Sequence, residues 1–342
     1  MENIQLINKK KDKNIYYLNI NKKIFLKFLF LFSLIILIKK YLFYNKLFKK
    51  KNIINKIKTI KICICTTGKK ENRYIREFLT FYEKYGVDKI FLYDNNDING
   101  EFFEDIIKDF IDKGFVKIFN WRGKKRTGYT IRNDCYLRNK KKFDWLIFYD
   151  IDEYIHLKNY TNIKTFLNEQ KFKKCLKINL NWVMHTDNNL IYYDNRSLHE
   201  RFPVWEKNAK NNKKDNERKY RYKFILRGSD LESKMNYYNL ISKKVKGCNG
   251  NGKKSKLISE IYMENPDFEF YYIDHYYFKS VQEFIEKINK GDNYYGQNMG
   301  LKMVRINRFF KYNKITIEKL KYIEKYSGIN LTKFKQKLSK KI

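Results

Sequence analysis

A run of apolar residues that ends in three acids constrains the fold of this chain more than any other feature. The segment from Asp144 to Ile155 reads DWLIFYDIDEYI, and a short apolar run bounded by charge is typical of a buried strand. Asp150 and Asp152 are two residues apart, so on a strand both carboxylates point the same way. With Glu153 beside them, they would form an oxygen-rich site for Mg²⁺ or Mn²⁺. A solvated acidic turn is the alternative.

The region before this segment alternates predicted strands with predicted helices. The strands are expected at residues 60–67, 87–93 and 115–121, and the helices at residues 72–85, 101–113 and 130–140. This order predicts an α/β fold with a mixed, mainly parallel sheet flanked by helices. Ligands of such sheets bind beyond the carboxyl ends of the strands. The residues expected there are Thr66, Thr67, Asp94, Asn95, Asn96, Asp150 and Asp152.

Downstream of the acids the pattern is less regular. Residues 175–185 read as a further strand, and residues 207–223 are so rich in Lys, Arg and Asn that they predict a solvated loop. Residues 247–254 resemble a phosphate-binding loop, but Lys254 replaces the Ser or Thr that Mg²⁺ needs, so a flexible basic loop is expected. From Val281 onward the helical period of apolar residues predicts a small C-terminal helical subdomain.

The N-terminal part predicts a membrane anchor. Residues 24–38 are apolar except for Lys27 and Ser33, and lysines flank both ends. We expect a signal anchor over residues 24–44, between a basic tail (1–23) and a stalk (45–58). A cleaved signal peptide and an interfacial helix are the alternatives. The main domain is expected over residues 59–292, followed by the helical extension over residues 293–342.

The formal net charge of +37 would ordinarily suggest nucleic acid or anionic lipid as a partner. The lysines, however, are spread along the chain together with many Asn, Ile, Tyr and Phe residues, as biased coding composition would produce. We therefore expect no nucleic-acid partner, although the charge favours anionic substrates. A basic nucleic-acid or membrane-binding protein without catalysis stays the alternative.

The five cysteines form no Cys-x-x-Cys pair and no zinc spacing. Cys63 and Cys65 alternate with isoleucines, so we expect them to be small core residues, and the redox compartment stays open. Glycosylation sequons begin at Asn159, Asn195 and Asn330. In a chain this rich in Asn they give only weak support for a lumenal location.

Beyond the stalk, from about residue 60 to residue 292, the chain resembles glycosyltransferases with the Rossmann-like GT-A fold, in particular family 92 and family-2-like membrane enzymes. The resemblance depends on several short segments taken in order. They are Cys63-Ile-Cys-Thr-Thr, Tyr93-Asp-Asn-Asn-Asp, Asn133-Asp-Cys, Trp145 to Glu153, Glu200-Arg-Phe and His275-Tyr-Tyr-Phe-Lys-Ser-Val-Gln-Glu-Phe.

The resemblance implies transfer of a sugar from a nucleotide donor, usually a UDP-sugar, to a glycan or glycoconjugate, with Mn²⁺ or Mg²⁺ on the diphosphate. Asp150, Asp152 and His275 would hold the metal. The residues implied to bind the nucleotide sugar are Thr66, Asp94, Asn95, Asp150 and Lys279. Lys279 could instead cover the helix that begins near Ser280, a plausible N-cap.

The same resemblance implies an acceptor site after residue 180. A sugar hydroxyl needs a general base if configuration inverts; Glu200 is the first candidate and Asp187 the second, while a surface ion pair with Arg201 is the alternative for Glu200. Trp182 would stack on a sugar ring, unless it is a core residue. Residues 183–185 depart from the small residues expected in the family. An inactive relative also stays possible, and if the organism is eukaryotic the resemblance implies a single-pass type II protein with its catalytic domain in the Golgi or ER lumen.

Overall fold

The computed structural model describes residues 33–43, 60–125, 127–205, 220–228, 247–257, 262–291 and 299–339. The chain divides into two compact units, Met1–Thr59 and Ile60–Ile342. In the first unit, residues 33–43 are helical and exposed. No helix within the described residues combines the length and hydropathy that crossing a bilayer requires. Parts of the predicted anchor (24–32 and 44), the basic tail and the stalk lie outside the described residues, so the anchor stays a prediction.

In the described part of the second unit, ten strands form one sheet in the order β3-β2-β1-β4-β7-β6-β10-β5, with β8 added beside β6 and β9 beside β7. The strands are β1 Ile62–Gly68, β2 Lys89–Asp94, β3 Val116–Asn120, β4 Trp145–Ile147, β5 Glu153–Leu157, β6 Lys177–Met184, β7 Tyr220–Arg227, β8 Gly247–Asn249, β9 Tyr262–Met263 and β10 Tyr271–His275. Strands β1 to β4 pair in parallel, and so do β6 with β8 and β10. Strands β5 and β7 run antiparallel to their neighbours. The predicted mixed, mainly parallel α/β sheet is confirmed.

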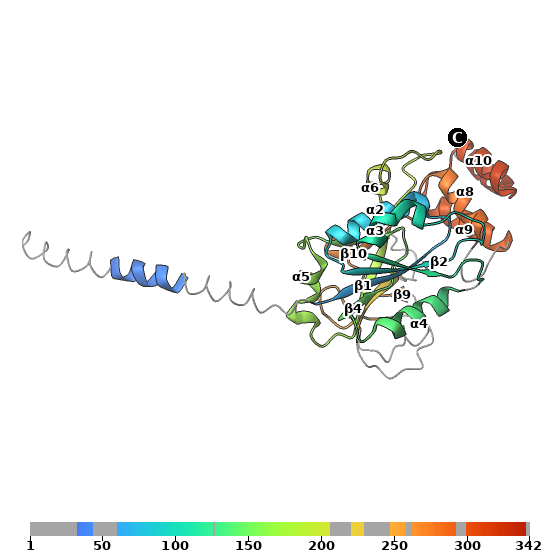
Figure 1. Cartoon of the computed structure of the whole chain (residues 1–342). Helices are drawn as coiled ribbons and strands as arrows, with labels where there is room; N and C mark the ends of the chain where they lie inside the picture. Colours follow the sequence, from blue (N-terminus) through green and yellow to red (C-terminus); the bar gives the residue numbers. More distant parts are fainter. Residues whose placement is uncertain are drawn as a thin grey trace, which may run out of the picture. The chain divides into compact units, whose positions relative to one another are not determined.

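Helices cover both faces of this sheet. They are α2 Asn72–Lys84, α3 Glu104–Asp112, α4 Gly128–Asn139, α5 Ile163–Leu167, α6 Leu198–Arg201, α8 Val281–Lys290, α9 Met299–Tyr312, α10 Ile317–Ser327 and α11 Thr332–Ser339, with a 3-10 turn at Gln170–Phe172. Helices α2 and α3 lie on one face and α4 on the other (Figure 1). The three helices predicted before the acidic segment are therefore confirmed, with ends shifted by a few residues.

Strand β1 shows how the sequence produces these two layers. Its side chains alternate between the faces of the sheet, so Ile62 and Ile64 join the buried cluster that contains α2 and α3. Cys63 and Cys65 join the cluster on the α4 side. Cys65 there forms a disulfide with Cys135 of α4, while Cys63 is free and buried. The prediction that both are small core residues is confirmed, but it did not include the disulfide of Cys65.

Two segments that we expected to be loops belong to the sheet. Residues 220–223 begin β7, whereas residues 207–219 lie outside the described residues. The expected flexible loop at residues 247–254 instead begins with β8, which pairs with β6 and is crosslinked through the Cys175–Cys248 disulfide. A hydrogen bond of 2.8 Å from Asn249 N to Lys253 O then closes a tight turn. The expectation of a flexible loop was wrong for residues 247–249, because their pairing with β6 and the disulfide to Cys175 are contacts with residues distant in sequence.

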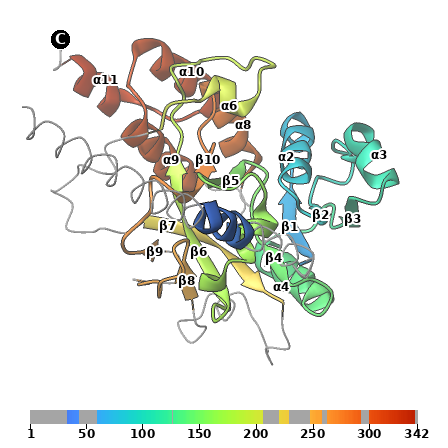
Figure 2. The same cartoon turned by 90° about the vertical axis from the view of Figure 1, so that its left-hand side faces the viewer.

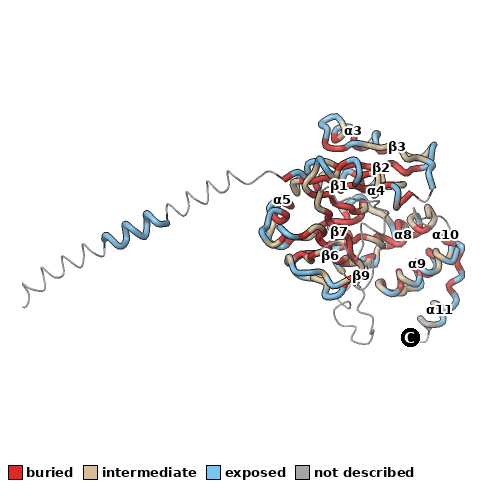
Figure 3. The backbone as a smooth tube through the Cα atoms, turned by 90° about the horizontal axis from the view of Figure 1, so that it is seen from below, coloured by how far each residue is buried: buried red, intermediate tan, exposed pale blue. Residues whose placement is uncertain are grey.

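The predicted C-terminal helical subdomain is confirmed. Helices α8, α9 and α10 share a separate buried cluster, and its largest side chains are Phe278, Phe284, Phe309 and Phe310. These helices gather on one side of the molecule (Figure 2). Burial follows the layers, with the strands buried and the outer helix surfaces exposed (Figure 3). The cluster begins with α8, the helix that carries cations toward the acidic turn described next.

Candidate active site

The acids lie in a turn between two strands rather than on one strand. Strand β4 ends at Ile147, and β5 begins at Glu153. The turn is closed by hydrogen bonds of 3.0 Å from Asp150 N to Glu153 Oε2 and from Glu153 N to Asp150 O. Our expectation that strand alternation aligns Asp150 with Asp152 is therefore wrong. The backbone conformation of the turn, and not strand alternation, brings Asp150 and Asp152 to the same cavity.

Strand pairing brings His275 to this turn from the far end of the domain. Strand β10 runs antiparallel to β5 and sets His275 opposite Glu153. Its Nε2 atom lies 3.5 Å from Asp152 Oδ1 and 3.9 Å from Glu153 Oε1. Burial lowers the pKa of His275 to about 4, so the imidazole is neutral near pH 7 and one ring nitrogen keeps a lone pair. The ring of Trp182 lies 4.4 Å from that of His275, centroid to centroid.

Three lysines, from β7, from α8 and from the loop before α8, lie near the acids, and two of them, Lys223 and Lys287, were not selected from the sequence. Lys223 of β7 contacts Asp150 at 2.7 Å and Glu153 at 3.1 Å. Lys287 of α8 lies 2.6 Å from Asp152 Oδ2, and Lys279 lies 3.7 Å from the same atom. In a chain with 74 Lys and Arg residues, no local pattern marks these positions.

Because of these contacts, the three neighbouring acids differ in pKa. Burial opposes the charge on Asp152, but Lys287 and Lys279 together hold the pKa of its carboxyl well below the usual range. The side chain of Asp150 is 42% exposed, and the ion pairs with Lys223 and Arg132 lower the pKa of its carboxyl. Burial raises the pKa of Glu153 to about 8. At neutral pH the two aspartates are therefore the charged acids of the turn.

A cavity of about 200 Å³ opens at the acids. Five of the residues selected from the sequence line it and so meet in one place; they are Thr67 from the end of β1, Asp150, Asp152, Trp182 and His275. Among the other lining residues are four cations from three segments. The cations are Lys69, Lys287, Lys290 and Arg305.

Asp94 and Asn95, expected to bind the nucleotide at the end of β2, instead form an ion pair and hydrogen bonds with other residues of the chain. Asp94 is buried and forms an ion pair of 2.6 Å with Arg122. The side-chain amide of Asn95 donates to the carbonyl groups of Trp121 and Lys124. Thr66 is buried, and its hydroxyl has no hydrogen-bond partner. Asp94 and Asn95 thus fix the loop after β3, and a role of any of the three in nucleotide binding stays a prediction.

The two candidate bases do not line the cavity. Glu200 is exposed and completes the capping box of α6 with Ser197. Asp187 is buried and lies 2.5 Å from Lys319. Lys279 is also buried, covering the ring of Tyr74 at 4.1 Å, and Ser280 after it caps α8 as expected. These placements give Glu200 and Asp187 roles in local structure.

The chemistry of the acidic turn fits a divalent cation. Within the described residues, no three His, Cys, Asp or Glu side chains form a group that could hold a metal ion alone. Asp152 and His275 nevertheless present an anionic oxygen and a neutral nitrogen close together, a donor set that suits Mn²⁺. The buried atoms Glu153 Oε1 and His275 Nδ1 have no hydrogen-bond partner. Asp152 and His275, with Asp150 nearby, would hold a cation that completes its shell with phosphate oxygens and water.

Comparison with known families identifies the chain. The model of the family described as Glycosyltransferase family 92 matches residues 58–308. The chain belongs to glycosyltransferase family 92. The match includes the acidic turn, Trp182, His275 and all of α8, so every residue discussed above as a metal ligand lies within the family 92 region.

Individual relatives match a shorter part. A family 92 protein of Ricinus communis is 28% identical over 112 residues, which are 32% of this chain and 19% of the relative. One of Oryza sativa subsp. japonica is 25% identical over 115 residues, 33% of this chain and 19% of the relative. The matched part therefore spans about a fifth of the length of these curated relatives.

Similarity to solved structures is low. For S. aureus TarS 1–349 in complex with UDP-GlcNAc the TM-score is 0.34 at 13% identity, covering 78% of this chain and 82% of that chain. For the mannosyltransferase PcManGT from Pyrobaculum calidifontis in complex with GDP-Man and Mn²⁺ the TM-score is 0.29 at 6% identity, covering 36% of each chain.

Proposed function

We propose that this chain transfers a sugar from a nucleotide-sugar donor, a UDP-sugar first among them, to a glycan or glycoconjugate acceptor, with a divalent cation. The observation that carries the proposal is the meeting of Asp152 and His275 in a cavity edged by cations, within a family 92 domain. Acids that bind a cation and basic side chains that contact phosphate are both needed to hold a diphosphate.

Each part of the cavity has a role in this chemistry. The cation, bound by Asp152 and His275, would neutralise charge on the departing diphosphate. Lys287, Lys290 and Arg305 supply positive charge from α8 and α9, where it can contact the phosphate oxygens directly. Small-molecule sites usually begin at about 300 Å³, so a cavity of about 200 Å³ accounts for the phosphate end of a donor rather than for all of it. Trp182 lines the cavity with an aromatic face suited to a sugar ring.

The test is release of UDP from UDP-glucose, UDP-galactose and UDP-GlcNAc by the purified full-length chain, with and without Mn²⁺. We expect release with at least one donor, and only with the metal. Asp152→Ala should abolish it because the cation loses its charged ligand, whereas Asp112→Ala, on the exposed surface of α3, should leave it unchanged. Absence of release from all three donors, or full release by Asp152→Ala, would contradict the proposal.

A further inference from the structure

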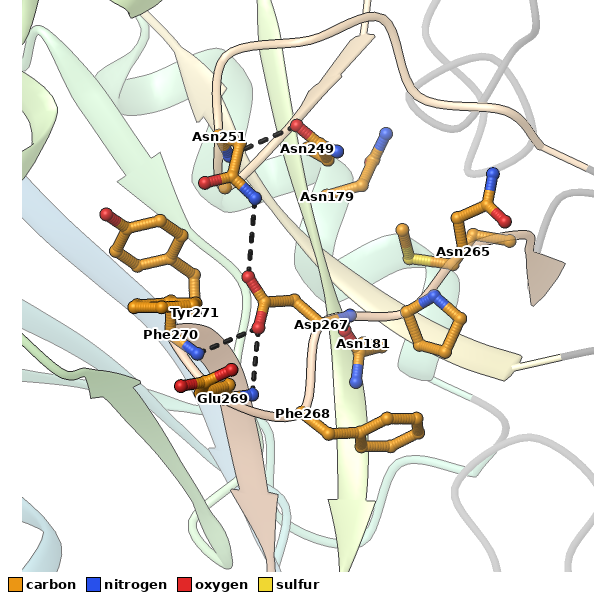
Figure 4. Close-up of a pocket in the computed structure, with 13 residues that line it drawn as sticks. Asn179, Asn181, Asn249, Asn251, Asn265, Asp267, Phe268, Glu269, Phe270 and Tyr271 are labelled. Atoms are coloured by element: carbon orange, nitrogen blue, oxygen red, sulfur yellow. Dashed lines mark hydrogen bonds between the residues drawn. The ribbon is translucent and has the colours of Figure 1, made fainter. Parts of the chain in front are cut away.

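A second cavity lies on the opposite side of β6 from Trp182. Asn181 immediately precedes Trp182 on this strand, so the two side chains point to opposite faces. The cavity measures about 370 Å³, which is within the range of small-molecule sites of about 300–1,000 Å³. Figure 4 shows residues from β6, from the turn after β8 and from the segment before β10 around it.

The chain is rich in Lys, but the residues that line this second cavity are mainly amide, aromatic and acidic. Five of its residues are Asn, three are aromatic and two are acidic, and no Lys or Arg is among the described residues that line it. They are Asn179, Asn181, Asn249, Asn251, Asn265, Phe268, Phe270, Tyr271, Asp267 and Glu269. Another cavity, beside β2 and β3, is lined by Lys61, Lys89, Lys117, Arg138 and Lys142. Lys158 pairs with Glu269 at 3.0 Å and Lys171 lies 4.6 Å from the ring of Tyr271, but neither lysine lines the cavity. Among the described residues, the lining itself therefore offers no cation to a phosphate group.

Two buried amides in the wall are each only half used. Asn181 Oδ1 accepts a hydrogen bond of 2.8 Å from Asp267 N, and Asn179 Nδ2 donates one of 3.0 Å to Ser255 Oγ. Their other atoms, Asn181 Nδ2 and Asn179 Oδ1, have no partner, although both side chains are only 1% exposed. A buried polar group left unpaired costs about 1–3 kcal/mol. The wall therefore contains one buried donor and one buried acceptor without a partner. These are the two functions that a hydroxyl group can satisfy.

The rest of the wall is held in place before any ligand binds. Asp267 Oδ1 accepts from the backbone N–H groups of Glu269 and Phe270 at 2.9 and 2.8 Å. Phe268 packs on other rings, stacked with Trp205 at 5.9 Å and edge-on to Tyr220 at 5.6 Å. Phe268 belongs to none of the three buried clusters of the described chain. It is an aromatic side chain at the cavity that the hydrophobic core does not use.

We propose that this second cavity binds a neutral sugar residue of a glycan, separately from the cavity at the acidic turn. Amides that donate and accept match the hydroxyl groups of a pyranose, and an aromatic ring matches its C–H face. A lining without Lys or Arg among the described residues disfavours nucleotides and phosphorylated sugars. The inference does not depend on the proposed transfer reaction, because sugar binding in the second cavity would involve neither Asp150 and Asp152 of the acidic turn nor a metal.

The test is a titration of the full-length chain with cellotetraose, maltotetraose, mannotetraose, xylotetraose and chitotetraose, followed by calorimetry or ligand-observed NMR. At least one should bind in the wild type. Phe268→Ala should weaken that binding at least tenfold because a stacking surface is lost. Asn251→Ala, which loses a side-chain contact to Asp267, should weaken it to a lesser degree. Tyr192→Ala, which removes an exposed aromatic ring outside this cavity, should bind as the wild type does.

Two results would overturn the inference. One is failure of all five oligosaccharides to bind; the other is equal binding by Phe268→Ala and Tyr192→Ala, with unfolding curves confirming that both are folded. UDP release without acceptor, measured on the same variants, separates the two proposals. Phe268→Ala should keep the wild-type rate of release, and a chain that binds an oligosaccharide here but releases no UDP would refute only the transfer reaction.

Discussion

Lys287 occupies a position beside Asp152 that a divalent cation would need. Its ammonium group lies 2.6 Å from Asp152 Oδ2. The lysine and a divalent metal ion would therefore compete for the same carboxylate oxygen. If a metal and a diphosphate were bound here, Lys287 could contact a phosphate oxygen instead of the carboxylate. A single side chain would then pair with Asp152 in one state and bind the charged substrate in the other.

This arrangement predicts opposite effects of Lys287→Met on two ligands. Mn²⁺ alone should bind more tightly, because its competitor for Asp152 is gone. The KM for the donor should rise roughly tenfold, because a hydrogen bond to a charged group contributes about 1.5–3 kcal/mol. Calorimetry with Mn²⁺ and initial rates of UDP release measure the two effects. Lys108→Met, at an exposed ion pair of α3, should change neither, and weaker Mn²⁺ binding by Lys287→Met would refute the competition.

At the scale of residues, the sequence predicts the acids and aromatic side chains of the cavity better than its cations. Asp150 and Asp152 follow an apolar run, and Trp182 and His275 are rare residue types, so their positions attract attention. Lys223 and Lys287 lie among 74 Lys and Arg residues. Only pairing of β7 with β4 and packing of α8 give these two lysines their places, and neither contact is local in sequence.

At the scale of elements, one buried carboxylate joins three helices. Glu283 of α8 accepts hydrogen bonds from Arg201 of α6 at 2.7 and 3.1 Å and from the Tyr74 hydroxyl of α2 at 2.6 Å. Arg201 is 1% exposed. Burial opposes the charge on Glu283, but the bonds from Arg201, Ser280 and Tyr74 lower the pKa of its carboxyl below the usual value of 4.5.

Glu283→Gln should destabilise the fold by about 3 kcal/mol at pH 7, because breaking a buried pair leaves Arg201 with an uncompensated charge. A lowered pKa in the folded state means that this stabilisation is present above about pH 4.5 and is lost as pH falls through the folded pKa. Urea unfolding at pH 7 and pH 4 should show a smaller fall in stability for the variant than for the wild type. Glu104→Gln, in the exposed first turn of α3, should keep the wild-type fall; an equal fall in Glu283→Gln would contradict the assignment.

Local pattern predicts the elements before the acidic turn, where strands and helices alternate at regular spacing, but it fails for β7 and β8. Residues 220–223 follow a polar stretch, yet they extend a strand that pairs with both β4 and β6. Strand β8 is short and contains glycine, and it is held by its neighbour β6 and by a disulfide. The antiparallel pairing of β7 between β4 and β6 and the disulfide of β8 join residues that are distant in sequence. The periodicity of apolar residues within a segment cannot predict such contacts.

At the scale of the molecule, two disulfides join parts of the chain that are far apart in sequence. Cys65–Cys135 spans 70 residues and links β1 to α4, and Cys175–Cys248 spans 73 residues. Disulfides persist in oxidising compartments, and the sequon residues Asn159, Asn195 and Asn330 are all exposed. Both observations agree with a lumenal location, which stays a prediction.

Replacing both cysteines of the first disulfide, as Cys65→Ala with Cys135→Ala, should lower the free energy of unfolding by about 4 kcal/mol, since a closed loop of this length restricts the unfolded chain. Urea unfolding measures the loss. Cys63→Ala removes a neighbouring buried thiol without breaking a crosslink, so it should cost clearly less. Thiol titration of the denatured, unreduced wild type should find a single free cysteine; five would disprove both disulfides.

The shared core of α8, α9 and α10 has a practical consequence for anyone who seeks a minimal catalytic fragment. Lys287, Lys290 and Arg305 line the cavity at the acids from α8 and α9, and Phe309 and Leu320 belong to the buried cluster that holds these helices together. A fragment cut after residue 298 would keep the acidic turn, Trp182 and His275, yet it would lose both Arg305 and the hydrophobic support of α8. Residues 299–342 therefore support the cavity that we propose as the active site, and removing them should impair donor binding before it impairs the sheet.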